Sequence, residues 1–145
     1  EMVDYVDDEI VLVVSPDQPL AGLAGVLPAN AVEHGLIVRE EGSATRRIAE
    51  RLFQALGVEP RIELEMGSNQ AVKQAAGAGG GIGVISRLGT VAEVKAGMLV
   101  ILDVDGWFCR RPLTLVYPKD RYLSPAQRAF REFLMDHRPG VLADR

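Results

Sequence analysis

The chain has 145 residues, of which 48% are hydrophobic and 25% are charged, and its net charge is −4 at pH 7. A chain of this length can form one stable buried core, and its net negative charge excludes a DNA-binding module built on a basic surface. The single cysteine, Cys109, excludes an internal disulfide and a cysteine-based metal site. Without an apolar run of membrane-spanning length or a signal-peptide pattern, we expect a cytoplasmic chain that needs no metal or cofactor.

Strand-like and helix-like segments alternate along the chain. Apolar runs and alternation predict strands over residues 9–14, 36–39, 61–66, 82–86, 99–104 and 113–117. Helical spacing predicts helices over residues 45–56, 70–78 and 91–96. A last helix begins where Ser124, Pro125 and Gln127 form a capping box. Strands that alternate with helices predict an α/β layered fold.

Polar residues mark the starts of two predicted helices, each directly after a predicted strand. The residues at these starts are Gly42, Ser43, Thr45, Arg46, Ser68 and Asn69. A helix N-terminus carries partial positive charge and unpaired N–H donors, which suits an anion. Ligands in open α/β sheets also lie beyond the carboxyl ends of strands. The pattern therefore fits an anion-binding site, and it equally fits ordinary capping by the Ser and Thr side chains, which needs no ligand.

A glycine-rich run over residues 77–83 follows a predicted helix and opens a predicted strand. A dinucleotide-binding loop has the opposite order, so we attribute these glycines to helix termination and close approach of the backbone. Neither His34 nor His137 lies beside an obvious nucleophile, and a structural role is the better interpretation of Cys109. We therefore expect no catalytic residues.

Several segments together resemble the effector-binding domain of LysR-type transcriptional regulators. They are Asp8–Ala21, Arg39–Arg46, Gly67–Gly79, Gly81–Ser86, Arg111–Val116 and Leu123–Leu134. Gln18 stands where this family usually has histidine. The sequences Gly-Ser-Ala-Thr-Arg and Gly-Ser-Asn-Gln-Ala-Val-Lys-Gln are most similar to the RuBisCO-operon and cysteine-biosynthesis branches of the family.

The resemblance implies a type 2 periplasmic-binding-protein-like fold, in which two α/β lobes enclose an effector. Residues 15–112 would form one complete Rossmann-like lobe. Remnants of the other lobe would be a crossover strand in residues 1–14 and a return strand with the C-terminal helix in residues 113–145. The N-terminal part of the family, with its helix-turn-helix, would be missing. The resemblance places Ser43, Thr45 and Arg46 in the cleft, with Ser68 and Asn69 as further candidates.

The function that the resemblance implies is effector sensing rather than catalysis. A small anionic metabolite would bind between the lobes of a homodimer or tetramer. The assembly would contact DNA only through the missing helix-turn-helix and would contact no membrane. One alternative is a solute-binding lobe of a transport receptor, which shares the fold and predicts an export signal. Another is an enzyme of the same architecture, which needs a base and a nucleophile at the cleft.

Overall fold

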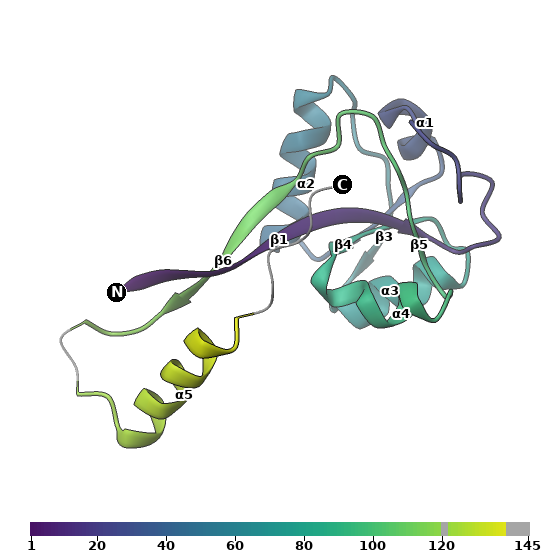
Figure 1. Ribbon diagram of the computed structural model, residues 1–145. Coiled ribbons are helices and arrows are strands. Elements are labelled where there is room, and N and C mark those ends of the chain that lie inside the picture. Colours follow the sequence, from purple (N-terminus) through teal and green to yellow (C-terminus); the bar gives the residue numbers. More distant parts are fainter. Residues whose placement is uncertain (120–121, 139–145) are drawn as a thin grey trace. The chain divides into compact units, whose positions relative to one another are not determined.

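The structure is a computed structural model that describes residues 1–119 and 122–138, and the chain forms two compact units (Figure 1). Unit 1 comprises residues 1–8 and 110–145, and unit 2 comprises residues 9–109. The lobe boundaries predicted after residues 14 and 112 lie a few residues further along the chain than these divisions. The helix starts of interest both belong to unit 2.

Unit 2 is built on a twisted sheet with the strand order β3-β2-β4-β1-β5. The strands are β1 (Met2–Val14, which begins in unit 1), β2 (Leu36–Arg39), β3 (Ile62–Met66), β4 (Ile82–Ser86) and β5 (Val100–Ile101). β2 runs parallel to both β3 and β4, whereas β1 is antiparallel to β4 and β5. The predicted α/β fold is confirmed.

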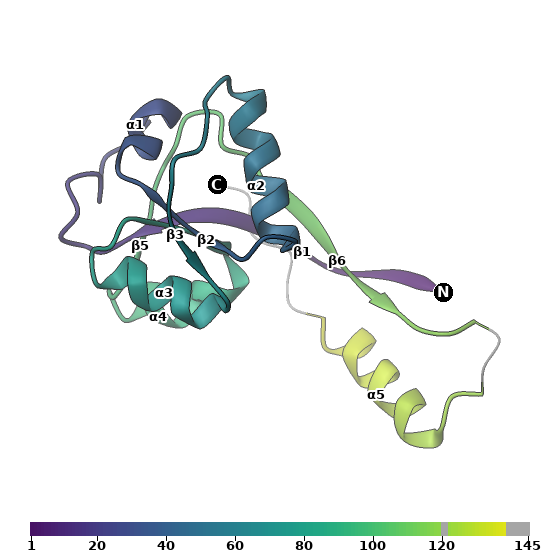
Figure 2. The same cartoon turned by 180° about the vertical axis from the view of Figure 1, so that it is seen from behind.

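Helices cover both faces of this sheet (Figures 1 and 2). α1 (Pro28–Glu33) and α2 (Ala44–Ala55) share one core with Ile10, Leu12 and Val14 of β1. α3 (Asn69–Gly77) and α4 (Val91–Lys95, after the 3-10 turn Leu88–Thr90) share the other core with Val11 and Val13. Successive strand residues point to opposite faces, so the continuous apolar run of β1 feeds both cores.

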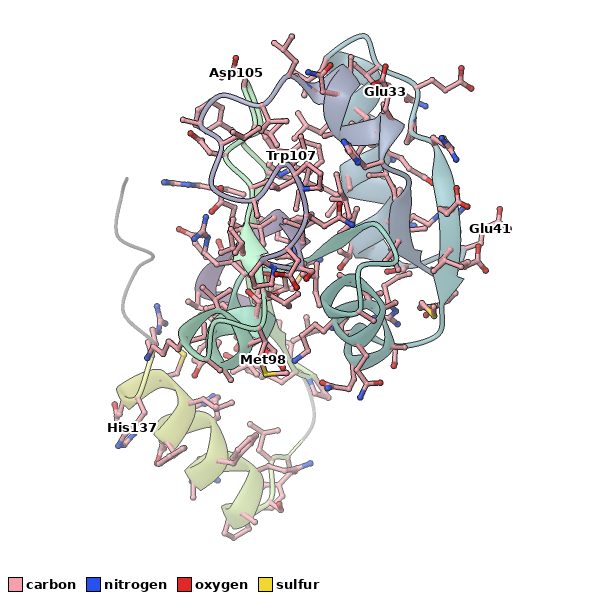
Figure 3. All side chains as sticks on the ribbon, turned by 90° about the vertical axis from the view of Figure 1, so that its right-hand side faces the viewer. Glu33, Glu41, Met98, Asp105, Trp107 and His137 are labelled. Atoms are coloured by element: carbon pink, nitrogen blue, oxygen red, sulfur yellow. The ribbon has the colours of Figure 1, made fainter. Side chains whose placement is uncertain are left out.

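Phe53 anchors the first of these cores. Its side chain is 1% exposed, and its ring centroid lies 4.6 Å from that of Trp107. The Trp107 indole Nε1 donates a 2.8 Å hydrogen bond to the carbonyl of Ile10, so the buried polar atom of this large side chain is satisfied. Figure 3 shows Trp107 among the packed side chains of unit 2. Cys109 is also buried here, in agreement with a structural role.

The glycine run over residues 77–83 allows close packing between α3 and the sheet. Gly81 has φ +138°, and a Cβ added there would lie 2.6 Å from the carbonyl oxygen of Gly35. A Cβ on Gly83 would lie 3.0 Å from the side chains of Ala76 and Val13. A larger residue in place of Gly83 would push α3 away from the strands, and one in place of Gly81 would push away the backbone at Gly35. The interpretation of close backbone approach is therefore confirmed.

Unit 1 contains the N-terminal part of β1, β6 (Arg110–Val116) paired with it, and α5 (Pro125–Asp136). The predicted capping box is confirmed: the Ser124 hydroxyl accepts from the Gln127 N–H, and the Gln127 side chain accepts from the Ser124 N–H. Among the described residues, no helix is long and apolar enough to cross a membrane.

Some elements differ from their predicted lengths. β1 begins at Met2 rather than near residue 9, because its first half pairs with β6. The strand expected over 99–104 shortens to Val100–Ile101. The strict alternation of residues 61–66 predicts a strand with one face in solvent and the other buried. The apolar face is not fully buried, because Ile62 and Leu64 remain 38% and 37% exposed on a strand that lies at the edge of the sheet.

Candidate functional site

The two polar helix starts lie at the same edge of the sheet. β2 and β3 are parallel neighbours, and their last residues, Arg39 and Met66, are paired in register. The Glu40 N–H extends this pairing by donating a 3.1 Å bond to the Met66 carbonyl. α2 then begins at Ala44 and α3 at Asn69. Both N-termini therefore follow the carboxyl ends of adjacent parallel strands, the position at which open α/β sheets bind ligands.

The start of α2 is shaped by a tight turn and a hydroxyl that does not cap the helix. Gly42 has φ +90°, a conformation that glycine adopts without strain. Ser43 occupies the N-cap position with an extended backbone, but among the described residues its side chain makes no capping hydrogen bond. Thr45, in the first turn, is 7% exposed. Capping by the Ser43 hydroxyl, one of the ordinary explanations for this segment, is therefore excluded here.

The start of α3 is capped in the ordinary way. The Ser68 hydroxyl oxygen accepts a 3.1 Å hydrogen bond from the N–H of Ala71, which satisfies one first-turn donor. Asn69 accepts a 2.7 Å bond at Oδ1 from Nη1 of Arg39. The predicted capping role of Ser68 is confirmed, and Asn69 connects its helix to the end of β2.

Arg39 is the residue at this edge that the sequence did not single out. Its Nε and Nη2 each donate a 2.7 Å bond to a carboxylate oxygen of Glu40, while Nη1 reaches Asn69. This hydrogen-bonded pairing raises the pKa of the Arg39 guanidinium and lowers the pKa of the Glu40 carboxyl. The Arg39-Glu40 neighbourhood is visible in the sequence, but the contact with Asn69 depends on the parallel register of β2 and β3.

Arg46 is surrounded by acceptors. Its Nε donates to Glu50 at 2.8 Å, and its Nη1 donates to Glu65 and, at 3.3 Å, to the Arg39 carbonyl. Hydrogen bonds from Glu50 and then Glu65 raise the pKa of this guanidinium. The side chain is only 16% exposed. The structure thus brings Arg46 to the predicted edge, but with its charge already balanced by two carboxylates.

The chemistry available at this edge is that of aligned backbone donors and hydroxyls. Arg39 and Arg46 are both neutralised by glutamates, and Glu41 projects outward from the turn before α2 (Figure 3). The attraction for an anion would therefore come from the partial positive charge of the helix N-termini rather than from formal charge. Over residues 1–119 and 122–138, no group of three or more His, Cys, Asp or Glu side chains is arranged to hold a metal ion.

Comparison with known proteins gives the family to which this arrangement belongs. Residues 3–139 match the LysR substrate binding domain, so the chain belongs to this family. Its fold is accordingly that of the type 2 periplasmic-binding-protein-like domains of LysR-type regulators. The effector-binding domain of QuiR, in complex with shikimate, shares the fold at 21% identity, with a TM-score of 0.79.

The chain is also similar to individual transcriptional regulators and regulatory domains. The chain is 41% identical over 131 residues to the RuBisCO operon transcriptional regulator of Allochromatium vinosum, covering 90% of this chain and 43% of that protein. It is similar at 33% identity, with a TM-score of 0.84, to the regulatory domain of Synechocystis PCC6803 CcmR in complex with 2-PG, covering 94% of this chain and 65% of that one. The chain thus spans less than half the length of the regulator from Allochromatium vinosum.

These relatives decide between the hypotheses that the sequence left open. The family and its named members are transcriptional regulators, which supports the regulator hypothesis over the transport receptor. They also agree with the expectation that the domain is not an enzyme.

Proposed function

We propose that this chain is the effector-sensing domain of a LysR-type regulator and that it binds a small anionic metabolite at the starts of α2 and α3. The observation that carries the proposal is the Ser43 hydroxyl, which stands at the N-cap of α2 without capping it. This hydroxyl lies at the carboxyl ends of β2 and β3, where α3, capped by Ser68, also begins. Gly42, Thr45 and Asn69 complete the proposed binding surface, with Arg46 beside it.

The larger protein would use this site as a switch. Unit 2 would act as one lobe, and the effector would also contact the other lobe of the cleft. An effector changes the balance between two conformations only if it binds one of them more tightly. DNA would be contacted by a helix-turn-helix outside these 145 residues, in a cytoplasmic homodimer or tetramer. This proposal is supported by the regulators among the relatives.

A ligand titration with matched cap variants tests the proposed site. The probes are 2-PG, which the CcmR regulatory domain binds, and inorganic phosphate. Wild type, Ser43→Ala and Ser124→Ala are compared by thermal unfolding and calorimetric titration. Ser124 is the matched control because it is also a serine N-cap, with an intact capping box in unit 1.

We expect opposite patterns from the two variants. Ser43→Ala should weaken binding of the probe with little loss of stability, since no capping bond is removed. Ser124→Ala should lower stability by about 1 kcal/mol and leave probe affinity unchanged. A probe at 100 times its Kd should stabilise the wild type by about 2.7 kcal/mol. Equal probe affinity in wild type and Ser43→Ala would remove Ser43 from the site, and no stabilisation by either probe would count against the proposal.

A further inference from the structure

Arg46 connects three separate elements at the candidate site. Its own helix, α2, supplies Glu50; the end of β2 supplies the Arg39 carbonyl; and β3 supplies Glu65. An arginine fork can hold several acceptors at once because its N–H donors lie in one rigid plane. The first turn of α2 is therefore connected to the ends of both neighbouring strands.

The connection continues to the second helix through Arg39. The same residue whose carbonyl accepts from Arg46 donates through its side chain to Asn69, the first residue of α3. A single chain of hydrogen bonds thus runs from α2, across the carboxyl ends of β2 and β3, to α3. These contacts join the two helix starts in addition to the backbone pairing of β2 and β3.

The surroundings of Arg46 make it a poor direct contact for an anion. Its side chain is 16% exposed, and both of its ion-pair partners are carboxylates. Turning the guanidinium toward a ligand would give up these charge-assisted bonds, which are the strong ones in proteins, and would leave two glutamates facing an anion. The cost of this exchange opposes direct binding.

We infer that Arg46 is a positioning residue: it holds the start of α2 against β2 and β3, and through Arg39 against α3, so that the two N-termini present their donors at a fixed spacing. The role of this spacing in affinity rests on the proposed function. The structural part, the coupling of the two helix starts, stands on the contacts alone.

Glu65→Gln separates positioning from direct contact because the two roles predict opposite signs. If Arg46 bound the anion, removing a competing carboxylate would strengthen binding of 2-PG. If Arg46 positions α2, losing the Glu65 charge should weaken binding by about two- to fivefold, the range expected for one partly exposed ion pair. Glu63→Gln is the matched control, since Glu63 lies on the same strand and pairs with Arg61 instead.

Arg46→Lys and Arg46→Gln form a second comparison. Lysine keeps the positive charge but lacks the planar fork that reaches several acceptors. Positioning predicts that both variants lose affinity for 2-PG to a similar extent and that the salt dependence of binding keeps the wild-type slope. Retention of affinity in Arg46→Lys alone, or a shallower salt dependence in Arg46→Gln, would overturn the inference.

Hydrogen exchange tests the coupling without any ligand. Glu65→Gln should speed exchange of the first hydrogen-bonded amides of both helices, those of Arg47 in α2 and Val72 in α3, whereas Glu63→Gln should leave them as in wild type. Unchanged exchange at α3 would overturn the coupling through Arg39. If the wild type binds neither 2-PG nor phosphate, the proposed function fails, and the exchange result still decides whether Arg46 holds the two helix starts together.

Discussion

Asp8 carries the most completely buried charge among the described residues, and its removal should destabilise the chain strongly. The residue is 0% exposed on β1, and its Oδ2 accepts from Nε and Nη2 of Arg111 at 3.0 and 2.9 Å. Removing one partner of a buried ion pair costs about 3–5 kcal/mol because the other charge loses its compensation. The Arg111 side chain is 18% exposed and can turn toward water, so we expect Asp8→Ala to cost about 3 kcal/mol.

Asp7→Ala provides the control at the adjacent position. Asp7 is exposed on the same strand, so its loss should change stability by no more than about 0.5 kcal/mol. In differential scanning calorimetry, Asp8→Ala should lower Tm by roughly 6–12 °C, and Asp7→Ala should leave Tm almost unchanged. Similar shifts for the two variants would refute the argument that burial decides the energy of this pair.

Two further predictions concern the core around Phe53 and the stability of the chain at acidic pH. Phe53→Ala should cost about 3–5 kcal/mol in chemical denaturation, because it opens a cavity against Trp107, whereas Phe133→Ala, at a position 54% exposed, should cost much less. Hydrogen bonding to Lys73 lowers the pKa of Glu93, so its contribution to stability is fully present above the unfolded pKa of about 4.3. That contribution should disappear as the pH falls through the lowered folded pKa, and Lys73→Met should remove this part of the acid transition.

The sequence predicted those elements whose signals are local. The capping box of α5 is complete within four consecutive residues, so its start could be assigned without any tertiary contact. The strand Ile82–Ser86 and the helix that follows Ser43 were likewise predicted close to their observed bounds. The predicted bounds of β1 and the predicted burial of β3 were wrong because both depend on non-local pairing. The first half of β1 is a strand because it pairs with β6, and β3 stays exposed because it is the outermost strand of the sheet.

For the candidate site, the sequence could name residue types but could not say how each one is used. It left open whether Ser43, Thr45, Ser68 and Asn69 cap helices or contact a ligand. The structure shows that Ser68 caps α3 and that Ser43 does not cap α2. Two serines in similar local sequences thus differ in whether they cap a helix, because the backbone at Ser43 has φ −60° and the backbone at Ser68 has φ −151°.

The order of strands, helix starts and apolar runs along the chain was sufficient to determine the α/β class and the family resemblance, because these patterns depend on neighbours in sequence. Only the tertiary structure decided that the carboxyl ends of β2 and β3 lie side by side in register. That pairing brings Arg39 to Asn69, and Arg46 to Glu65. Such contacts join residues that lie far apart in the chain, and their formation depends on the whole sheet being assembled rather than on any local preference.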